Sequence, residues 1–231
     1  MKAVAASPSG ACPTSWGLFL ENKSTAGTMI NSITEEFPVV SGHLSLDLVN
    51  TEVVRRGGRH DLLITSEDLI HWVETMRRTG SLVPSVLPEG YDSPEALRTL
   101  RSVRDFLRGN FEEIADGGNP AGDLKDRLEE WMERSPFSYR MIGSSLVPVP
   151  KGHPADALAS LVAFDALRLL AAGDLQTLHR CANPDCVLLF IDASGRRKWC
   201  SMRICGNRAK VARHQSLKGN KTRMDEGKAD E

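Results

Sequence analysis

Four of the five cysteines in this 231-residue chain fall within a span of 25 residues. Their spacing is Cys-x4-Cys, a gap of 13 residues and a second Cys-x4-Cys, formed by Cys181, Cys186, Cys200 and Cys205. Two close pairs separated by a short span can each hold one side of a tetrahedral ion, as in four-thiolate zinc sites, although the gap within a pair is usually two residues. We therefore predict one Zn²⁺ per chain, bound by these four thiolates.

Three other uses of the cysteines are alternatives to zinc. Disulfides suit an oxidising compartment, but the N-terminal residues show no secretion signal. Iron–sulfur clusters also use four cysteines, typically at other spacings, and scattered structural thiols rarely pair so regularly. Cys12 is assigned no role. We expect a cytoplasmic protein without membrane contact, because no apolar stretch is long enough to span a bilayer.

The residues around the cysteines predict a small folded module. Asn183-Pro184-Asp185 is typical of a turn, and the apolar run 187–191 is typical of a strand. After a turn at 192–195, we expect residues 196–199 to return as the second strand of a hairpin. Ser201 is a good N-cap for a helix over about 202–214, with Cys205 in its first turn. This order of knuckle, hairpin and helix predicts a treble-clef-like zinc finger over residues 179–215.

Charge is distributed unevenly along the chain. The net charge of −1 divides into −7 for residues 1–178, +9 for 179–223 and −3 for 224–231. A basic segment of this kind is a candidate nucleic-acid footprint, although a solvated tail is the alternative, and part of the charge offsets the thiolates on zinc. We predict DNA contacts from the basic residues of the module, which are Arg196, Arg197, Lys198, Arg203, Arg208, Lys210 and Arg213. For Arg208, as for Asn207 beside it, a structural role within the finger is the alternative.

The residues at 205–208, Cys-Gly-Asn-Arg, resemble the signature of the CGNR zinc-finger family, and the similarity extends to 181–186 and 197–202. Residues 44–51 resemble the opening motif of the ABATE domain, the mostly helical domain that precedes this finger. The resemblance implies a stress-induced transcription regulator that binds zinc and DNA. Since the family's opening motif usually lies close to the N-terminus, it also implies that Met29 is the true start.

The body of the chain carries several helix signals. Thr65 and Asp68 have capping-box spacing, and Ser93-Pro94 and Asn119-Pro120 are typical helix starts. Pro154 opens the most apolar helix, which Gly173 ends, while residues 139–149 suggest a hairpin. We expect a mostly α fold with a minor β element. The expected parts are a disordered extension (1–34), an ABATE-like α-rich domain (35–178) packed against the finger (179–215), and a disordered charged tail (216–231).

The sequence is also compatible with functions other than DNA binding. Asp47, Asn50 and Thr51 share one face if their segment is helical, so they are candidates for a small-molecule pocket; cross-links to nearby backbone are the alternative. A protein-interaction finger without direct DNA contact is the main functional alternative, while only Phe190 and Trp199 offer the finger stacking surfaces for RNA. We predict no enzyme, because no catalytic motif is found and four protein ligands leave zinc no open position.

Overall fold

A computed structural model describes residues 37–83 and 86–215. These residues all belong to one compact unit, Thr34–Glu231. We call residues 35–178 the body and 179–215 the finger. The expectations for Cys12, Met29, the N-terminal extension and the C-terminal tail lie outside the described residues.

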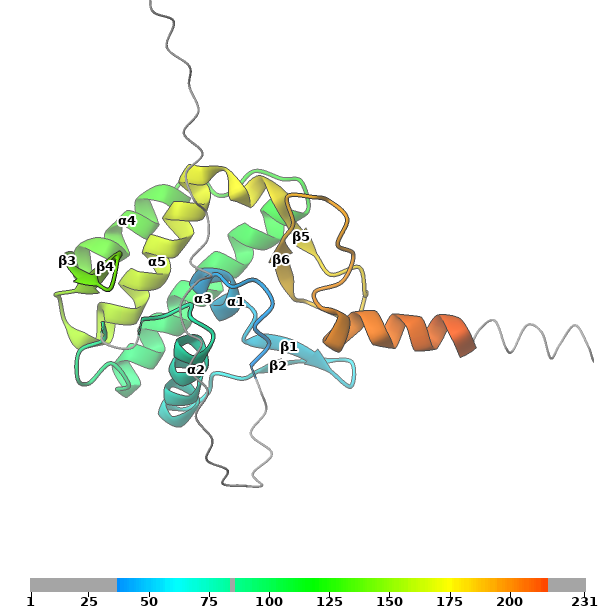
Figure 1. The fold of residues 1–231 in the computed structure, drawn as a ribbon, viewed down its shortest axis with the longest axis horizontal. Coiled ribbons are helices and arrows are strands. Elements are labelled where there is room, and N and C mark those ends of the chain that lie inside the picture. The colour runs from blue at the N-terminus through cyan, green and yellow to red at the C-terminus, as the bar shows by residue number, and fades with distance from the viewer. Residues whose placement is uncertain (1–36, 84–85, 216–231) are drawn as a thin grey trace, which may run out of the picture. The chain divides into compact units, whose positions relative to one another are not determined.

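Helices dominate the described residues, and the strands form short antiparallel pairs (Figure 1). The helices are α1 (Leu44–Val49), α2 (Ser66–Arg78), α3 (Pro94–Ala115), α4 (Leu124–Arg134), α5 (Pro154–Ala172), the 3-10 helix η1 (Asp174–Thr177), and the π-helical turn η2 (Met202–Gly206), which continues as α-helix over 207–215. The pairs are β1 (Glu52–Arg55) with β2 (Gly58–Asp61), β3 (Phe137–Ile142) with β4 (Ser145–Pro150), and β5 (Leu178–Arg180) with β6 (Leu189–Ile191). This confirms a mostly α fold with a minor β element.

Local sequence signals explain most helix ends. The Thr65 hydroxyl accepts from the Asp68 N–H and the Asp68 carboxylate accepts from the Thr65 N–H, so both halves of the predicted capping box form. Ser93 caps α3 by accepting from the Ala96 N–H. Gly173 ends α5 with a φ of 76°, a left-handed conformation that favours glycine.

The predicted helix start at Asn119-Pro120 is wrong, because α4 begins at Leu124. The side-chain oxygen of Asn110 accepts a hydrogen bond from the Ala121 N–H at 2.8 Å. This bond ties the connecting loop to α3, so the chain becomes helical only beyond it.

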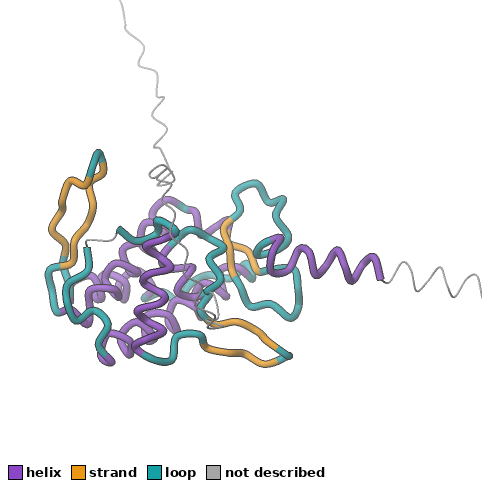
Figure 2. The backbone as a smooth tube through the Cα atoms, turned by 60° about the horizontal axis from the view of Figure 1, so that its bottom comes forward, coloured by secondary structure: helices purple, strands orange, loops and turns teal. Residues whose placement is uncertain are grey.

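Helix α5 is the centre of the body and contacts α1, α3 and α4 (Figures 1 and 2). Its buried positions cover most of its circumference, and many of them are small residues. Small side chains allow neighbouring helices to approach closely, which suits a helix surrounded by others. None of the helices among the described residues is both long and apolar enough to cross a membrane.

The β1–β2 hairpin is an element that the sequence patterns did not predict. Arg55 pairs with Gly58, so Arg56 and Gly57 form a two-residue turn with φ values of 50° and 79°. Two positive φ values define a type I′ turn, whose twist matches that of a hairpin. The hairpin points to the same side of the body as the helix over 207–215, and this helix projects away from the body (Figures 1 and 2).

Candidate metal centre

The four clustered cysteines come together in space. Their sulfur atoms all lie within 4.8 Å of one another, and the Sγ atoms of Cys186 and Cys200 are 3.9 Å apart. A tetrahedral Zn²⁺ with Zn–S bonds of about 2.3 Å requires sulfur–sulfur distances of about 3.8 Å. The four thiols therefore fit a zinc ion.

Two short segments position the thiols. The first pair lies in a knuckle that follows β5, where the Cys186 N–H donates to the carbonyl of Asn183 at 2.9 Å. The second pair flanks the start of η2, where the Ser201 hydroxyl accepts from the Ile204 N–H at 3.0 Å. This confirms Ser201 as the N-cap and places Cys205 in the first turn.

The predicted return strand over 196–199 does not form. Strand β6 pairs with β5 instead, so the hairpin carries the first cysteine pair at its tip. Residues 192–197 curl around the carboxylate of Asp192, which accepts from the N–H groups of Ser194 and Arg197. Because the Arg197 N–H donates to Asp192 within this turn, it is not available for a strand-to-strand hydrogen bond with β6. A hydrogen bond from the Ser194 hydroxyl, together with the Arg197 N–H, lowers the pKa of Asp192 to about 2.

Hydrogen bonds to sulfur favour negative charge at the centre. The Cys200 N–H lies 3.3 Å from the Cys181 sulfur, and the Asn183 amide lies 3.5 Å from the Cys205 sulfur. Hydrogen bonds from Cys186 and Cys200 lower the pKa of Cys181 to about 2, and the interaction with Cys181 raises that of Cys186 to about 12. The negative charge of the Cys181 thiolate thus disfavours ionisation of the Cys186 thiol, as expected where several thiolates need a cation to balance their charge.

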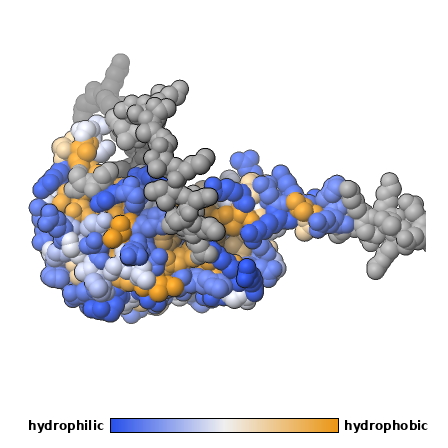
Figure 3. Space-filling model, turned by 90° about the horizontal axis from the view of Figure 1, so that it is seen from below, coloured by the Kyte–Doolittle hydropathy of each residue, from blue (hydrophilic) through white to orange (hydrophobic). Residues whose placement is uncertain are grey.

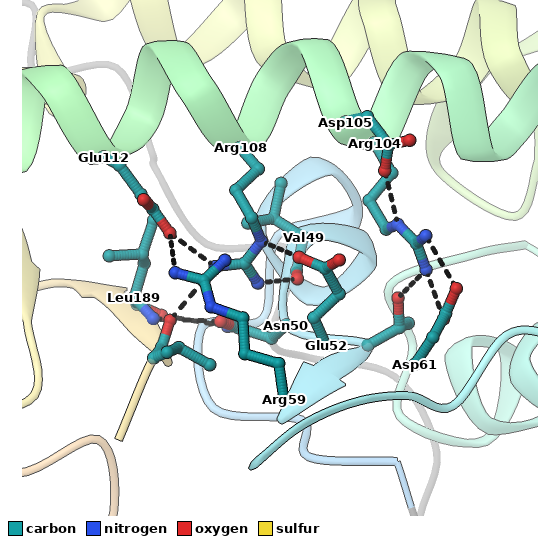
Figure 4. Close-up of polar contacts among 12 residues, drawn as sticks. Val49, Asn50, Glu52, Arg59, Asp61, Arg104, Asp105, Arg108, Glu112 and Leu189 are labelled. Atoms are coloured by element: carbon teal, nitrogen blue, oxygen red, sulfur yellow. Dashed lines mark hydrogen bonds and ion pairs between the residues drawn. The ribbon is translucent and has the colours of Figure 1, made fainter. Parts of the chain in front are cut away.

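The finger is fastened to the body by buried polar contacts (Figure 4). The Asn50 amide forms two hydrogen bonds of 2.9 Å with Leu189, donating to its carbonyl and accepting from its N–H. Arg108 of α3 donates to the carbonyls of Val49 and Val187, and its guanidinium also pairs with Glu52. One buried arginine therefore joins α1, α3, β1 and the loop before β6.

A second buried arginine holds the β1–β2 hairpin to α3 (Figure 4). Arg104 is 2 % exposed and donates through both terminal nitrogens to the Asp61 carboxylate, and also to the Thr51 hydroxyl. Burial alone would raise the pKa of Asp61, but the hydrogen bonds and charge of Arg104 hold it below its ordinary value. Asp61 lies 43 positions before Arg104 in the sequence, so this pairing could not be predicted from a local pattern.

The three candidate pocket residues are buried and hydrogen-bonded within the protein. The Asp47 carboxylate accepts from three backbone N–H groups of the loop over 40–42. Burial raises the pKa of Asp47, and these donors oppose that shift. Asn50 bonds to the finger and the Thr51 hydroxyl donates to the Leu48 carbonyl, so all three side chains make the internal cross-links that were the alternative.

The basic residues predicted to contact DNA do not form one face. Arg197 is half-buried. Its guanidinium donates a hydrogen bond to the carbonyl of Val40 and lies 4.2 Å from the ring centre of Phe190, and these contacts indicate a structural role. Arg208 and Lys210 project in directions about 200° apart around their helix. Apart from Arg197, the predicted contacts are exposed; they are Arg196, Lys198, Arg203, Arg208, Lys210 and Arg213.

A cavity of about 850 Å³ lies beside the metal centre. One wall is the β1–β2 hairpin, with Arg55 and Arg56, and the other is the knuckle and the start of the C-terminal helix, with Arg208. Sequence reasoning missed the two hairpin arginines. Their signal was the run Arg-Arg-Gly-Gly-Arg-His at 55–60, which has no acidic residue and would have marked a basic turn.

Two family comparisons agree with this architecture. Residues 177–217 match the CGNR zinc finger, and residues 42–173 match the ABATE family, described as "Putative stress-induced transcription regulator". Neither description is that of an enzyme. No curated protein matches the chain. Because the second match spans more than half of the sequence, the chain belongs to the ABATE family, and it carries a C-terminal CGNR zinc finger.

Proposed function

We propose that this protein is a transcription regulator that binds DNA through its zinc-held finger. The single observation that carries the proposal is the exposed helix over 207–215. It projects from the body, and a space-filling view shows hydrophilic residues along most of the visible side of the projecting helix (Figure 3). Its basic residues Arg208, Lys210 and Arg213 are exposed, and the segment holds no acidic residue.

The dimensions of this helix suit duplex DNA. An α-helix with its side chains is about 10–12 Å across, and the major groove of B-DNA is about 12 Å wide. In this arrangement Lys210 contacts base edges or phosphates within the groove. Arg196 and Lys198, in the exposed loop before the third cysteine, provide additional phosphate contacts.

Zinc has a structural role in this proposal. One ion per chain, held by Cys181, Cys186, Cys200 and Cys205, fixes the knuckle against the start of the helix. With all four ligands supplied by the protein, the ion has no open position for substrate, so we propose no catalytic activity.

An electrophoretic shift assay with random-sequence duplex DNA tests the function. We expect zinc-loaded protein to retard the duplex at about 50 mM salt, where phosphate contacts are strong. Chelation of zinc should abolish the shift, because the helix loses its anchor at Cys205. If zinc-loaded protein leaves the duplex unshifted at this low salt, direct DNA binding is refuted, and the protein-interaction alternative becomes the better account.

A further inference from the structure

We propose that the β1–β2 hairpin of the body and the helix over 207–215 together clamp one sugar-phosphate backbone of duplex DNA. This inference rests on the proposed function and deepens it. It assigns to the ABATE domain a direct part in DNA binding, with the cavity beside the metal centre as the phosphate site.

The first support is the geometry of the cavity. The hairpin and the helix extend on the same side of the molecule (Figure 1). Residues of both bound the 850 Å³ cavity. On the helix, Arg208 and Ala212 line the cavity four residues apart, so they lie on one helical face, and Ile204 of η2 lines it as well. The cavity also contacts Cys186 and Cys205, which makes one wall dependent on the metal centre.

The second support is charge. Among the described residues, the charged side chains that line the cavity are three arginines and one acid, namely Arg55, Arg56, Arg208 and Asp185. The metal ligands Cys186 and Cys205 line it too, so part of the arginine charge offsets the thiolates on zinc. Arginines from two walls facing one space favour a polyanion, and guanidinium groups bind phosphate oxygens through paired hydrogen bonds. A phosphate backbone therefore complements this cavity.

Duplex geometry explains why two projections are needed. A single sugar-phosphate backbone separates the major groove from the neighbouring minor groove. If the helix enters the major groove, the backbone beside it passes through the cavity and the hairpin turn reaches the minor-groove side. Arg208 then faces the clamped backbone, whereas Lys210, about 200° away around the helix, faces the groove interior.

The test measures duplex affinity against salt for full-length zinc-loaded variants, by fluorescence anisotropy. Arg56→Asn is the central variant. It removes the charge but places Asn-Gly in a type I′ turn, the sequence that this turn prefers, so the hairpin stays folded. We expect affinity to fall several-fold at about 0.1 M salt and the slope of log K against log salt to shrink by about 0.9.

Two further variants separate an effect of the cavity on DNA affinity from a folding defect and from the loss of any surface arginine. Asp185→Asn removes the acid from the cavity and should raise affinity several-fold, a gain that a folding defect cannot produce. Arg140→Ala removes an exposed arginine from β3, which lies at the end of the body away from the finger in Figure 1, and should change neither affinity nor slope.

The outcomes distinguish the clamp from the proposed function. If wild-type protein binds and Arg56→Asn behaves like Arg140→Ala, the clamp is wrong and binding by the finger stands. If wild-type protein does not bind at any salt, the proposed function fails and the clamp fails with it. Equal affinity for single-stranded DNA, with the same loss in Arg56→Asn, would overturn the arrangement across two grooves.

Discussion

Replacement of Asn50 by alanine should detach the finger from the body. Asn50 and Leu189 are both 0 % exposed and share two hydrogen bonds of 2.9 Å. Since the Cys181 N–H donates to the Leu188 carbonyl, alternation along the ladder makes Arg180 and Leu189 a non-hydrogen-bonded pair. The N–H and carbonyl of Leu189 therefore point away from β5, and the Asn50 amide binds them as a neighbouring strand would.

The magnitude follows from these two backbone groups. In Asn50→Ala, the Leu189 N–H and carbonyl stay buried and lose their partner, at a cost of about 1–3 kcal/mol each. The total, about 2–6 kcal/mol, is a large share of the roughly 5–15 kcal/mol that stabilises a typical domain. Asn50→Asp keeps the acceptor but turns a carboxylate oxygen toward the Leu189 carbonyl, so we expect a loss at least as large.

Urea unfolding measures the effect, followed by circular dichroism and tryptophan fluorescence. Asn207→Ala is the matched control, because Asn207 is exposed on the C-terminal helix and its loss should change the free energy of unfolding by less than about 0.5 kcal/mol. If Asn50→Ala is no more destabilising than this control, the attachment of the finger through Leu189 is refuted.

Three further predictions concern zinc, pH and backbone packing. Cys200→Ser should release zinc, measured by elemental analysis, and unfold the finger while the helical signal of the body persists in circular dichroism. The Asp165 carboxylate, 3.9 Å from the Nδ1 of His43, raises the pKa of His43 above its ordinary value of 6.5. The stabilisation of the folded state by protonated His43 is therefore complete below about pH 6.5 and is lost as the pH rises through the folded pKa. The urea midpoint should fall over this range in wild type and fall less in His43→Gln. Gly152→Ala should destabilise by about 1–3 kcal/mol, because the new Cβ would lie 2.2 Å from a backbone oxygen. Gly109 is exposed within α3 with open space around it, so Gly109→Ala should instead stabilise by about 0.5–1 kcal/mol in the same urea unfolding assay.

Features determined by neighbouring residues were predictable from the sequence. The Thr65 capping box, the Ser93 and Ser201 N-caps and the Gly173 helix end each depend on atoms within a few residues. The cysteine cluster was predictable for the same reason, since both pairs lie within one short segment.

Features that depend on distant partners were not predictable. Strand β6 could pair with the segment after it or with the segment before it. It pairs with β5, before it, while the Arg197 N–H after it donates to the Asp192 carboxylate and is not available to a ladder. No sequence pattern marked Arg108, because its partners include Val187, which lies 79 positions away. Asn50 was predicted as a candidate ligand residue because its partner Leu189 is more remote still, at 139 positions.

The salt dependence of duplex DNA binding by zinc-loaded wild-type protein tests the central claim most directly. The account predicts a steep linear fall of log K with log salt, with a slope of about −0.9 for each phosphate contacted, and the loss of this binding when zinc is chelated. Contacts from Arg56, Arg208 and the exposed basic residues of the finger predict a slope equivalent to several phosphates. A slope near zero, or binding that survives removal of zinc, would contradict the account.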